Sequence, residues 1–256
     1  MQLAGTYDGV IFLGDLMMYR EISSVSLENF TRLREATNWM AAIPGNGPLP
    51  EVVDFLSTLG VNIHGSSAYL DDIGFFGVGG VTDSVNLILD LRRFFFEERP
   101  KPIPLAAKSL ETLAYFGIHL QDGAFEVDEW DNSKVKEMEK LRGPFEHTEV
   151  EIYNFLEAGY EGIASRNLHI LLSHIPPYEE GLNSILPEGV STGSKAITRF
   201  IHTHNVSCAL SGHYHIHHEF NINGIPCIVF PAVVDDDYSI LSVDSKGKII
   251  INVNKF

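Results

Sequence analysis

The chain has few cysteines and no long apolar run. Among its 256 residues the cysteines are Cys208 and Cys227, and both lie in apolar stretches. We therefore expect two reduced core thiols in a cytoplasmic protein rather than a disulfide. No apolar run approaches the roughly 18 residues that span a membrane, and no basic segment precedes an apolar one as in a signal peptide. We expect no membrane partner.

Positive charge is also scarce. Lys and Arg number 18 against 34 Asp and Glu, which gives a formal charge of −16. This balance argues against a general basic surface for nucleic acid. It also means that a small phosphorylated substrate needs local positive charge, which a bound metal ion can supply.

What the chain does have is an alternation of apolar strand and helix patterns. With 45% apolar residues, it is long enough for one large α/β domain over residues 1–256. Periodicity and turn residues predict strands over 8–13, 40–43, 61–64, 69–78, 168–172 and 207–210. They predict helices over 26–38, 50–58, 86–98, 149–163 and 194–204, and antiparallel strands between 227 and 253. The alternation breaks down over 82–167, which we interpret as an insertion or lid within the domain.

Four of the predicted strand ends carry side chains that can bind metal ions. They are Asp15, Asn46, His174, and His213 with His215. Taken singly, Asp15 also fits a turn or helix cap, and Asn46 a turn. Together, one carboxylate, one amide oxygen and three imidazoles form a set suited to Mn²⁺, Fe²⁺ or Zn²⁺ rather than Ca²⁺. Catalytic groups in α/β proteins gather at such strand ends.

The blocks around these residues carry a family resemblance. In order along the chain, they resemble the motifs of the calcineurin-like metallophosphoesterases: Gly14-Asp15, Gly45-Asn46, Ser173-His174-Ile175-Pro176-Pro177, Gly193-Ser194-Lys195-Ala196-Ile197 and Gly212-His213-Tyr214-His215. The resemblance implies a four-layer α/β/β/α sandwich of two mixed sheets. It implies hydrolysis of a phosphomonoester or phosphodiester by a metal-activated hydroxide, with Asp15, Asn46 and His174 in catalytic roles.

The same resemblance implies how the ligands divide between two ions. Asp15 bridges the ions, Asn46, His174 and His213 hold one of them, and His215 helps to hold the other. The chain departs from the family at its start, because residues 1–7 contain no Asp-x-His block. The histidine that some members place after the asparagine is replaced here by Gly47-Pro48.

Two explanations for the departure stay open. Either the true start lies upstream, or the protein is a degenerate member that keeps one metal site. For the chain as given we expect one tight ion and a second position that is weak or vacant, unless His217 or an upstream segment contributes. Asp8 lies too far away, at the other end of the strand that leads to Asp15. A missing first strand would also leave a gap at the centre of its sheet.

A second function from another class is a non-catalytic scaffold that binds a protein partner. The missing block, the missing histidine and the aromatic run Phe94-Phe95-Phe96 favour it. Fold alone does not decide between the two, because one fold carries many functions.

Overall fold

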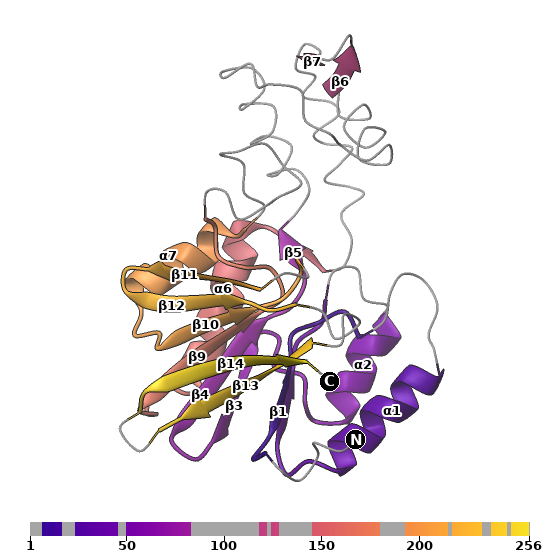
Figure 1. Cartoon of the computed structure of the whole chain (residues 1–256), viewed down its shortest axis with the longest axis vertical. Coiled ribbons are helices and arrows are strands. Elements are labelled where there is room, and N and C mark those ends of the chain that lie inside the picture. Colours follow the sequence, from indigo (N-terminus) through magenta and orange to yellow (C-terminus); the bar gives the residue numbers. More distant parts are fainter. Residues whose placement is uncertain are drawn as a thin grey trace.

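A six-stranded mixed sheet forms the centre of the protein (Figure 1). The computed structural model describes residues 7–16, 24–45, 50–82, 118–121, 124–127, 145–179, 193–214, 217–231, 237–244 and 247–255. In sheet order the strands are β11 (His218–Ile222), β12 (Ile225–Val229), β10 (Cys208–Ser211), β9 (Leu168–Ser173), β4 (Ile73–Val78) and β3 (Ser66–Leu70). The four middle strands are parallel, and the two edge strands are antiparallel to their neighbours.

The middle strands are buried on both faces, as their continuous apolar sequences predict. In β9, Leu171 packs into one hydrophobic cluster, whereas Ile170 and Leu172 pack into another. Successive side chains of a strand point to opposite faces, so each cluster is the core on one side of the sheet. The four middle strands are parallel, so their carboxyl ends lie at one edge of the sheet, and His174 and His213 follow β9 and β10 there.

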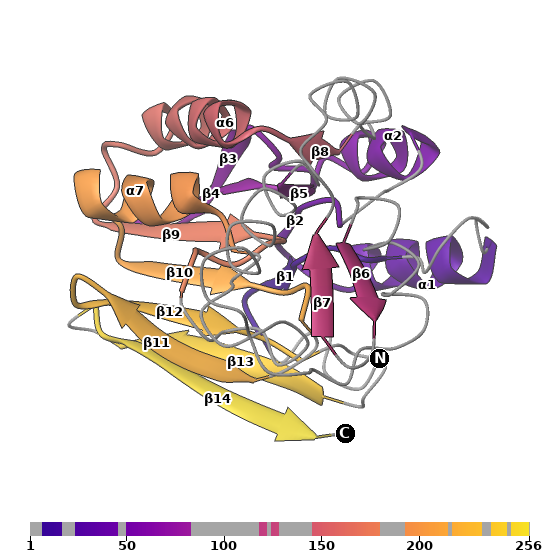
Figure 2. The same ribbon diagram turned by 90° about the horizontal axis from the view of Figure 1, so that it is seen from above.

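Two helices cover one face of this sheet (Figure 2). They are α6 (Glu149–Glu161) and α7 (Lys195–Thr203). Thr148 and Glu151 form a reciprocal capping box at the start of α6, and Ser194 caps α7. These side chains satisfy amide groups that have no partner inside the helix.

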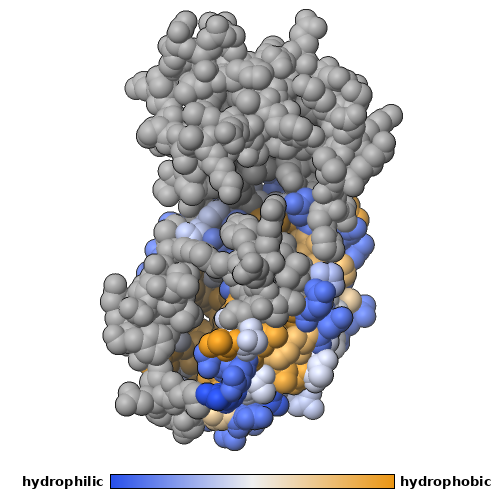
Figure 3. All heavy atoms as spheres, turned by 90° about the vertical axis from the view of Figure 1, so that its right-hand side faces the viewer, coloured by the Kyte–Doolittle hydropathy of each residue, from blue (hydrophilic) through white to orange (hydrophobic). Residues whose placement is uncertain are grey.

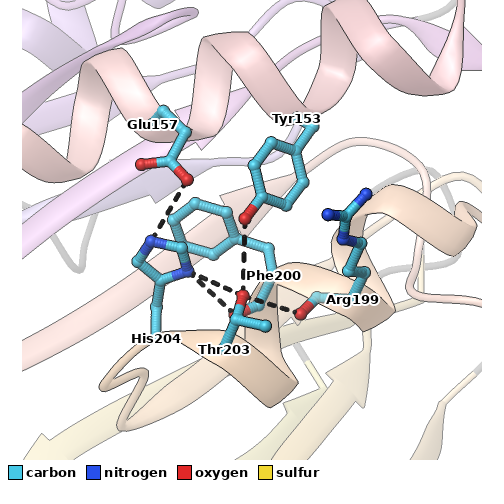
Figure 4. A network of polar contacts seen from close by, with 6 residues as sticks. All are labelled: Tyr153, Glu157, Arg199, Phe200, Thr203 and His204. Carbon is cyan, nitrogen blue, oxygen red and sulfur yellow. Dashed lines mark hydrogen bonds and ion pairs between the residues drawn. The ribbon is translucent and has the colours of Figure 1, made fainter.

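The two helices are also joined to each other by polar contacts. At one end, the Glu149 carboxylate accepts hydrogen bonds from the Ser194 hydroxyl at 2.6 Å and from the Ala196 amide at 2.7 Å. At the other, His204 Nε2 lies 3.2 Å from Glu157 Oε1, and its ring stacks on Phe200 with centroids 3.8 Å apart (Figure 4). The helix pair is thus fixed at both ends.

The opposite face of the sheet is covered by a second β layer. β1 (Val10–Phe12) pairs in parallel with β2 (Met40–Ala42), and β13 (Asp237–Val243) pairs antiparallel with β14 (Ile249–Lys255). Both pieces contribute to the core between the two β layers. Among the described residues β1 pairs with β2 alone, so this second layer consists of two separate strand pairs.

A second helical layer closes the sandwich. α1 (Ser24–Glu35) and α2 (Pro50–Thr58) pack through Phe30 and Leu56 on Met40 and Ala42 of β2. The order α1/α2, second β layer, six-stranded sheet, α6/α7 is visible in both views (Figures 1 and 2). The α/β/β/α sandwich that the sequence implied is confirmed.

Three details of the strand prediction were wrong. Residues 69–78 are not one strand, because Asp71, at φ 51°, turns the chain between β3 and β4. Residues 61–64 form isolated bridges rather than a strand. Strand β11 was not predicted, although Asn223-Gly224, both at positive φ, is a sequence typical of the tight turn in a hairpin.

The predicted insertion over 82–167 contains both short strands and a core helix. β5 (Val81–Thr82) pairs with β8 (Glu146–His147), and β6 (Ile118–Gln121) pairs with β7 (Ala124–Val127). α6 falls within the predicted range, yet its Ile152 and Leu156 are part of the main core. The helix predicted over 86–98 and the Phe94 to Phe96 run lie outside the described residues, as does the rest of 83–144 apart from β6 and β7. The lid role stays a prediction.

Cys208 and Cys227 are buried free thiols, as predicted. They lie on neighbouring strands, but Cys208 packs between the β layers and Cys227 packs beneath the helices. Burial raises the pKa of each thiol to about 12. Both are therefore protonated and chemically inert core residues at neutral pH.

The surface carries hydrophobic and hydrophilic groups side by side, as the face on the right-hand side of Figure 1 shows (Figure 3). The large hydrophobic side chains that are most exposed among the described residues are Val25, Tyr69, Val150 and Ile250. They belong to four different segments. No helix in the described part of the chain is long and apolar enough to cross a membrane.

A partly buried histidine, His64, lies where β5 and β8 meet the main sheet. The His64 ring stacks on His147 with centroids 5.2 Å apart and also contacts Phe155 at 4.4 Å. Its Nδ1 accepts the Gly79 amide at 3.0 Å, so the proton of the neutral ring is on Nε2. Burial, and after it the charge of His147, lowers the pKa of His64 from 6.5 to about 4.

This pKa predicts a loss of stability in acid. The unfolded chain takes up a proton on His64 below about pH 6.5, while the folded protein resists it until about pH 4. The neutral ring makes its full contribution to the free energy of unfolding above pH 6.5. This contribution, up to about 3 kcal/mol, is lost as the pH falls toward 4. His64→Asn, whose amide oxygen can replace Nδ1 as acceptor, should lose less stability than the wild type between pH 7 and 4.5 in urea unfolding.

The matched control is His217→Asn, because His217 is a partly exposed histidine that pairs with Glu219. This variant should show the same dependence of stability on pH as the wild type. Equal acid losses in wild type and His64→Asn would contradict the role assigned to His64.

Candidate metal centre

Asp15 lies at the end of β1 in a left-handed backbone conformation. Gly14 has φ 108° and Asp15 has φ 53°, so the backbone leaves the extended conformation soon after the strand. A Cβ added to Gly45 would lie 2.0 Å from Asp15 Oδ1. The Asp15 carboxylate therefore lies directly against the backbone that follows β2, and both positions need glycine because the two segments approach so closely.

His174 follows β9 and is almost fully buried, with 1% of its side chain exposed. Its Nδ1 lies 2.7 Å from the carbonyl oxygen of Leu13. A carbonyl can accept a hydrogen bond but cannot donate one, so Nδ1 carries a proton. This bond fixes the orientation of the ring and leaves Nε2 on the side of Asp15.

His174 Nε2 lies 3.3 Å from Asp15 Oδ2. With Nδ1 protonated, Nε2 of the neutral ring presents a lone pair, and the carboxylate is also an electron-pair donor. Two electron-pair donors this close, one buried and the other partly buried, are stable only with a cation between them, either a proton or a metal ion. Imidazole and carboxylate are a suitable pair for Mn²⁺, Fe²⁺ or Zn²⁺, so the two residues fit a metal site.

His213 extends the same cluster. It follows β10 at φ 73°, and its ring meets that of His174 edge to face with centroids 5.1 Å apart. The preceding Gly212 donates its amide to the His174 carbonyl at 3.1 Å. The ends of β1, β9 and β10 are thus joined by the hydrogen bonds of His174 to Leu13 and Gly212, which places Asp15, His174 and His213 in one neighbourhood.

The remaining predicted ligands, Asn46 and His215, lie outside the described residues. Within the described part of the chain no group of three or more His, Cys, Asp or Glu side chains has the geometry to hold a metal ion. Asp15 with His174 is the pair that the structure brings together, and His213 lies beside them.

The sequence also named His217 and Asp8 in connection with the second position. His217 pairs with Glu219 at 3.0 Å, and the adjacent His218 pairs with Glu179 at 2.9 Å. Asp8 is exposed and precedes β1, whereas Asp15 follows it. That Asp8 is not a ligand stays a prediction.

Sequence reasoning did not find the carbonyl of Leu13 or the role of the glycines. Leu13 is 161 residues from His174 along the chain, and any residue has a carbonyl, so nothing in the sequence indicates the contact. The glycines did leave a signal, because Gly14, Gly45 and Gly212 each precede a predicted ligand.

Comparison with solved structures shows a shared fold. The chain superposes on TT1561 of Thermus thermophilus with a TM-score of 0.60 and 18% identity, over 99% of this chain and 89% of that one. At this identity the similarity is one of fold. A structure described as a putative 5′-nucleotidase from Staphylococcus aureus superposes with a TM-score of 0.45 and 13% identity, over 96% of this chain and 44% of that one. The calcineurin-like phosphoesterase YfkN from Bacillus subtilis superposes with a TM-score of 0.42 and 13% identity, over 96% of this chain and 76% of that one.

No protein-family model matches the chain, and no curated protein matches its sequence. The layers observed here have the α/β/β/α order that the sequence resemblance implied.

The close approach at Gly14 generates a prediction. A Cβ there would lie 2.3 Å from His174 Nδ1, so Gly14→Ala should displace the imidazole and weaken Mn²⁺ binding by at least about ten-fold. The control is Gly60→Ala, because Gly60 also has positive φ, at 66°, but nothing within 4 Å of the added atom. It should cost about 1 kcal/mol of stability and leave Mn²⁺ affinity unchanged. Equal Mn²⁺ affinities for the two variants in calorimetry would contradict the prediction.

Proposed function

We propose that the protein is a metal-dependent phosphoesterase that hydrolyses a phosphomonoester or phosphodiester. The observation that supports this most is the convergence of His174 Nε2 and Asp15 Oδ2 at 3.3 Å, with the other ring nitrogen fixed by Leu13. The sequence motifs add Asn46, His213 and His215 to the proposed ligand set.

The proposed roles follow from the chemistry of these side chains. Asp15 and His174 hold a divalent ion, Mn²⁺, Fe²⁺ or Zn²⁺, with Asn46 and His213 completing its shell, and Asp15 is shared with a second, weaker position near His215. When bound, such an ion polarises phosphoryl oxygens and lowers the pKa of water, so that hydroxide is available for in-line attack at neutral pH. The hydrogen bond to Leu13 keeps the proton of His174 on Nδ1, so Nε2 stays available as a ligand.

Charge also favours a metal-dependent activity. The chain has a formal charge of −16, and an anionic phosphoester gains no attraction from that overall balance. Divalent cations next to Asp15 reverse the sign of the local field. The substrate is proposed to be a small phosphoester, with no general nucleic-acid surface and no membrane involved.

The first test is removal of the central ligand. His174→Ala should abolish tight Mn²⁺ binding and lower the rate of hydrolysis of bis-p-nitrophenyl phosphate by at least about 100-fold. Removing a residue that binds the ion directly should reduce affinity and activity at least as much as removing a residue that only orients it. The control is His218→Ala, which removes a histidine that pairs with Glu179. It should keep both properties.

The competing scaffold function makes the opposite forecast. A wild-type protein that binds less than one ion per chain and shows no turnover with added Mn²⁺ would overturn the enzyme proposal and favour the scaffold. Calorimetry and the chromogenic assay on the same sample decide between them.

The second test concerns the inequality of the two positions. We expect one tight and one weak ion in a Mn²⁺ titration, because a single position collects four of the proposed ligands. His215→Ala should leave most of the tight binding, in contrast to His174→Ala. Two equally tight sites would contradict this division of ligands.

A further inference from the structure

Two serine hydroxyls lie side by side beneath the proposed metal centre. Ser173 ends β9 and Ser211 ends β10, and the two residues are directly opposite each other in the parallel pair. The strand register flanks them with Val78 of β4 and Val229 of β12. Neighbouring strands lie about 4.8 Å apart, so the two side chains are neighbours on one face of the sheet.

That face is the one covered by α6 and α7. Leu171 of β9 and Ala209 of β10 belong to the helix-side core, and Ser173 and Ser211 are each two residues further along their strands. Because side chains alternate between faces, both hydroxyls point into this apolar layer. Both residues are completely buried.

Neither hydroxyl oxygen has a hydrogen-bond partner among the residues that the structure describes. A buried hydroxyl without a partner costs free energy, and two of them in register is an expensive arrangement for a dry core. A pair of polar groups facing the same space is instead the usual setting of an internal water molecule, and proteins hold about one such molecule per 27 residues.

We propose that an ordered water molecule bridges the hydroxyls of Ser173 and Ser211. The water accepts or donates one hydrogen bond with each serine and so joins the ends of β9 and β10 on the face that α6 and α7 cover. Ser173 immediately precedes His174, and Ser211 is two residues before His213. The bridge therefore fixes the spacing of the two strand ends from which both rings project.

The direct test is a crystal structure of the wild type at high resolution. We expect a solvent peak within about 2.7–3.0 Å of both oxygens. The absence of such a peak, or a direct hydrogen bond between the two hydroxyls, would overturn the proposal.

Thermal unfolding gives a second, independent readout. Ser173→Ala and Ser211→Ala should each lower Tm by about 2–4 °C, and the double variant should lose less than the sum, since either change alone removes the bridge. Dry hydroxyls would instead give variants with unchanged or raised Tm and additive effects, which would overturn the proposal.

Ser239→Ala is the matched control. The Ser239 hydroxyl is also buried without a partner among the described residues, but its neighbour across the β13–β14 pair is Val253 rather than a second serine. Its replacement should leave Tm unchanged or raise it. A loss of Tm equal to that of Ser173→Ala would show that the serine pair is not special, and would count against the bridge.

A third readout rests on the proposed function. If the bridge positions the ligands, Ser173→Ala should weaken Mn²⁺ binding by about ten-fold, whereas Ser239→Ala should not. Failure of the phosphoesterase proposal would remove this readout and leave the solvent peak and the Tm values to decide. An unchanged Mn²⁺ affinity together with a confirmed water would reject only the positioning of the ligands.

Discussion

The hydrogen bond from His174 Nδ1 to the Leu13 carbonyl, at 2.7 Å, connects the two β layers at the place where the candidate ligands meet. Leu13 follows β1 of the second layer, and His174 follows β9 of the six-stranded sheet. The bond determines the protonated nitrogen, the direction of the ring and hence the approach of Nε2 to Asp15. An outer hydrogen bond of this kind orients and tunes a metal ligand.

This contact requires the strand ends to lie very close together. Side chains at Gly14 and Gly45 would collide with His174 and Asp15, respectively, and positive φ at Asp15 and His213 turns the chain sharply after β1 and β10. Left-handed backbone at non-glycine residues is uncommon and costs free energy, and it is retained where the surrounding structure requires it. Its occurrence at two of the candidate ligands agrees with a site that packing holds in place.

Much of the fold could be predicted from the pattern of apolar residues. Continuous apolar runs at residues 168–172 and 207–210 indicate strands buried on both faces, and both are central strands. The errors arose where turn residues, rather than burial, decide the structure. Asp71 divides an apolar stretch into a hairpin, and Asn223-Gly224 creates β11 from a polar sequence that has little hydrophobic signal. Helix α6, assigned to an insertion, joins the core because its apolar side chains fit the sheet beneath.

The sequence by itself determined the chemical types of the candidate ligands, their order and their positions after strands, because apolar runs mark the strands and a glycine directly precedes Asp15, Asn46 and His213. Only the tertiary structure decided which donors converge. It brought His174 to Asp15, placed His213 beside them and left His217 paired with Glu219. The physical reason is that the partners are set by the packing of two sheets. The Leu13 carbonyl that orients His174 and the facing hydroxyls of Ser173 and Ser211 depend on strand register and layer contact. Local sequence patterns do not contain that information.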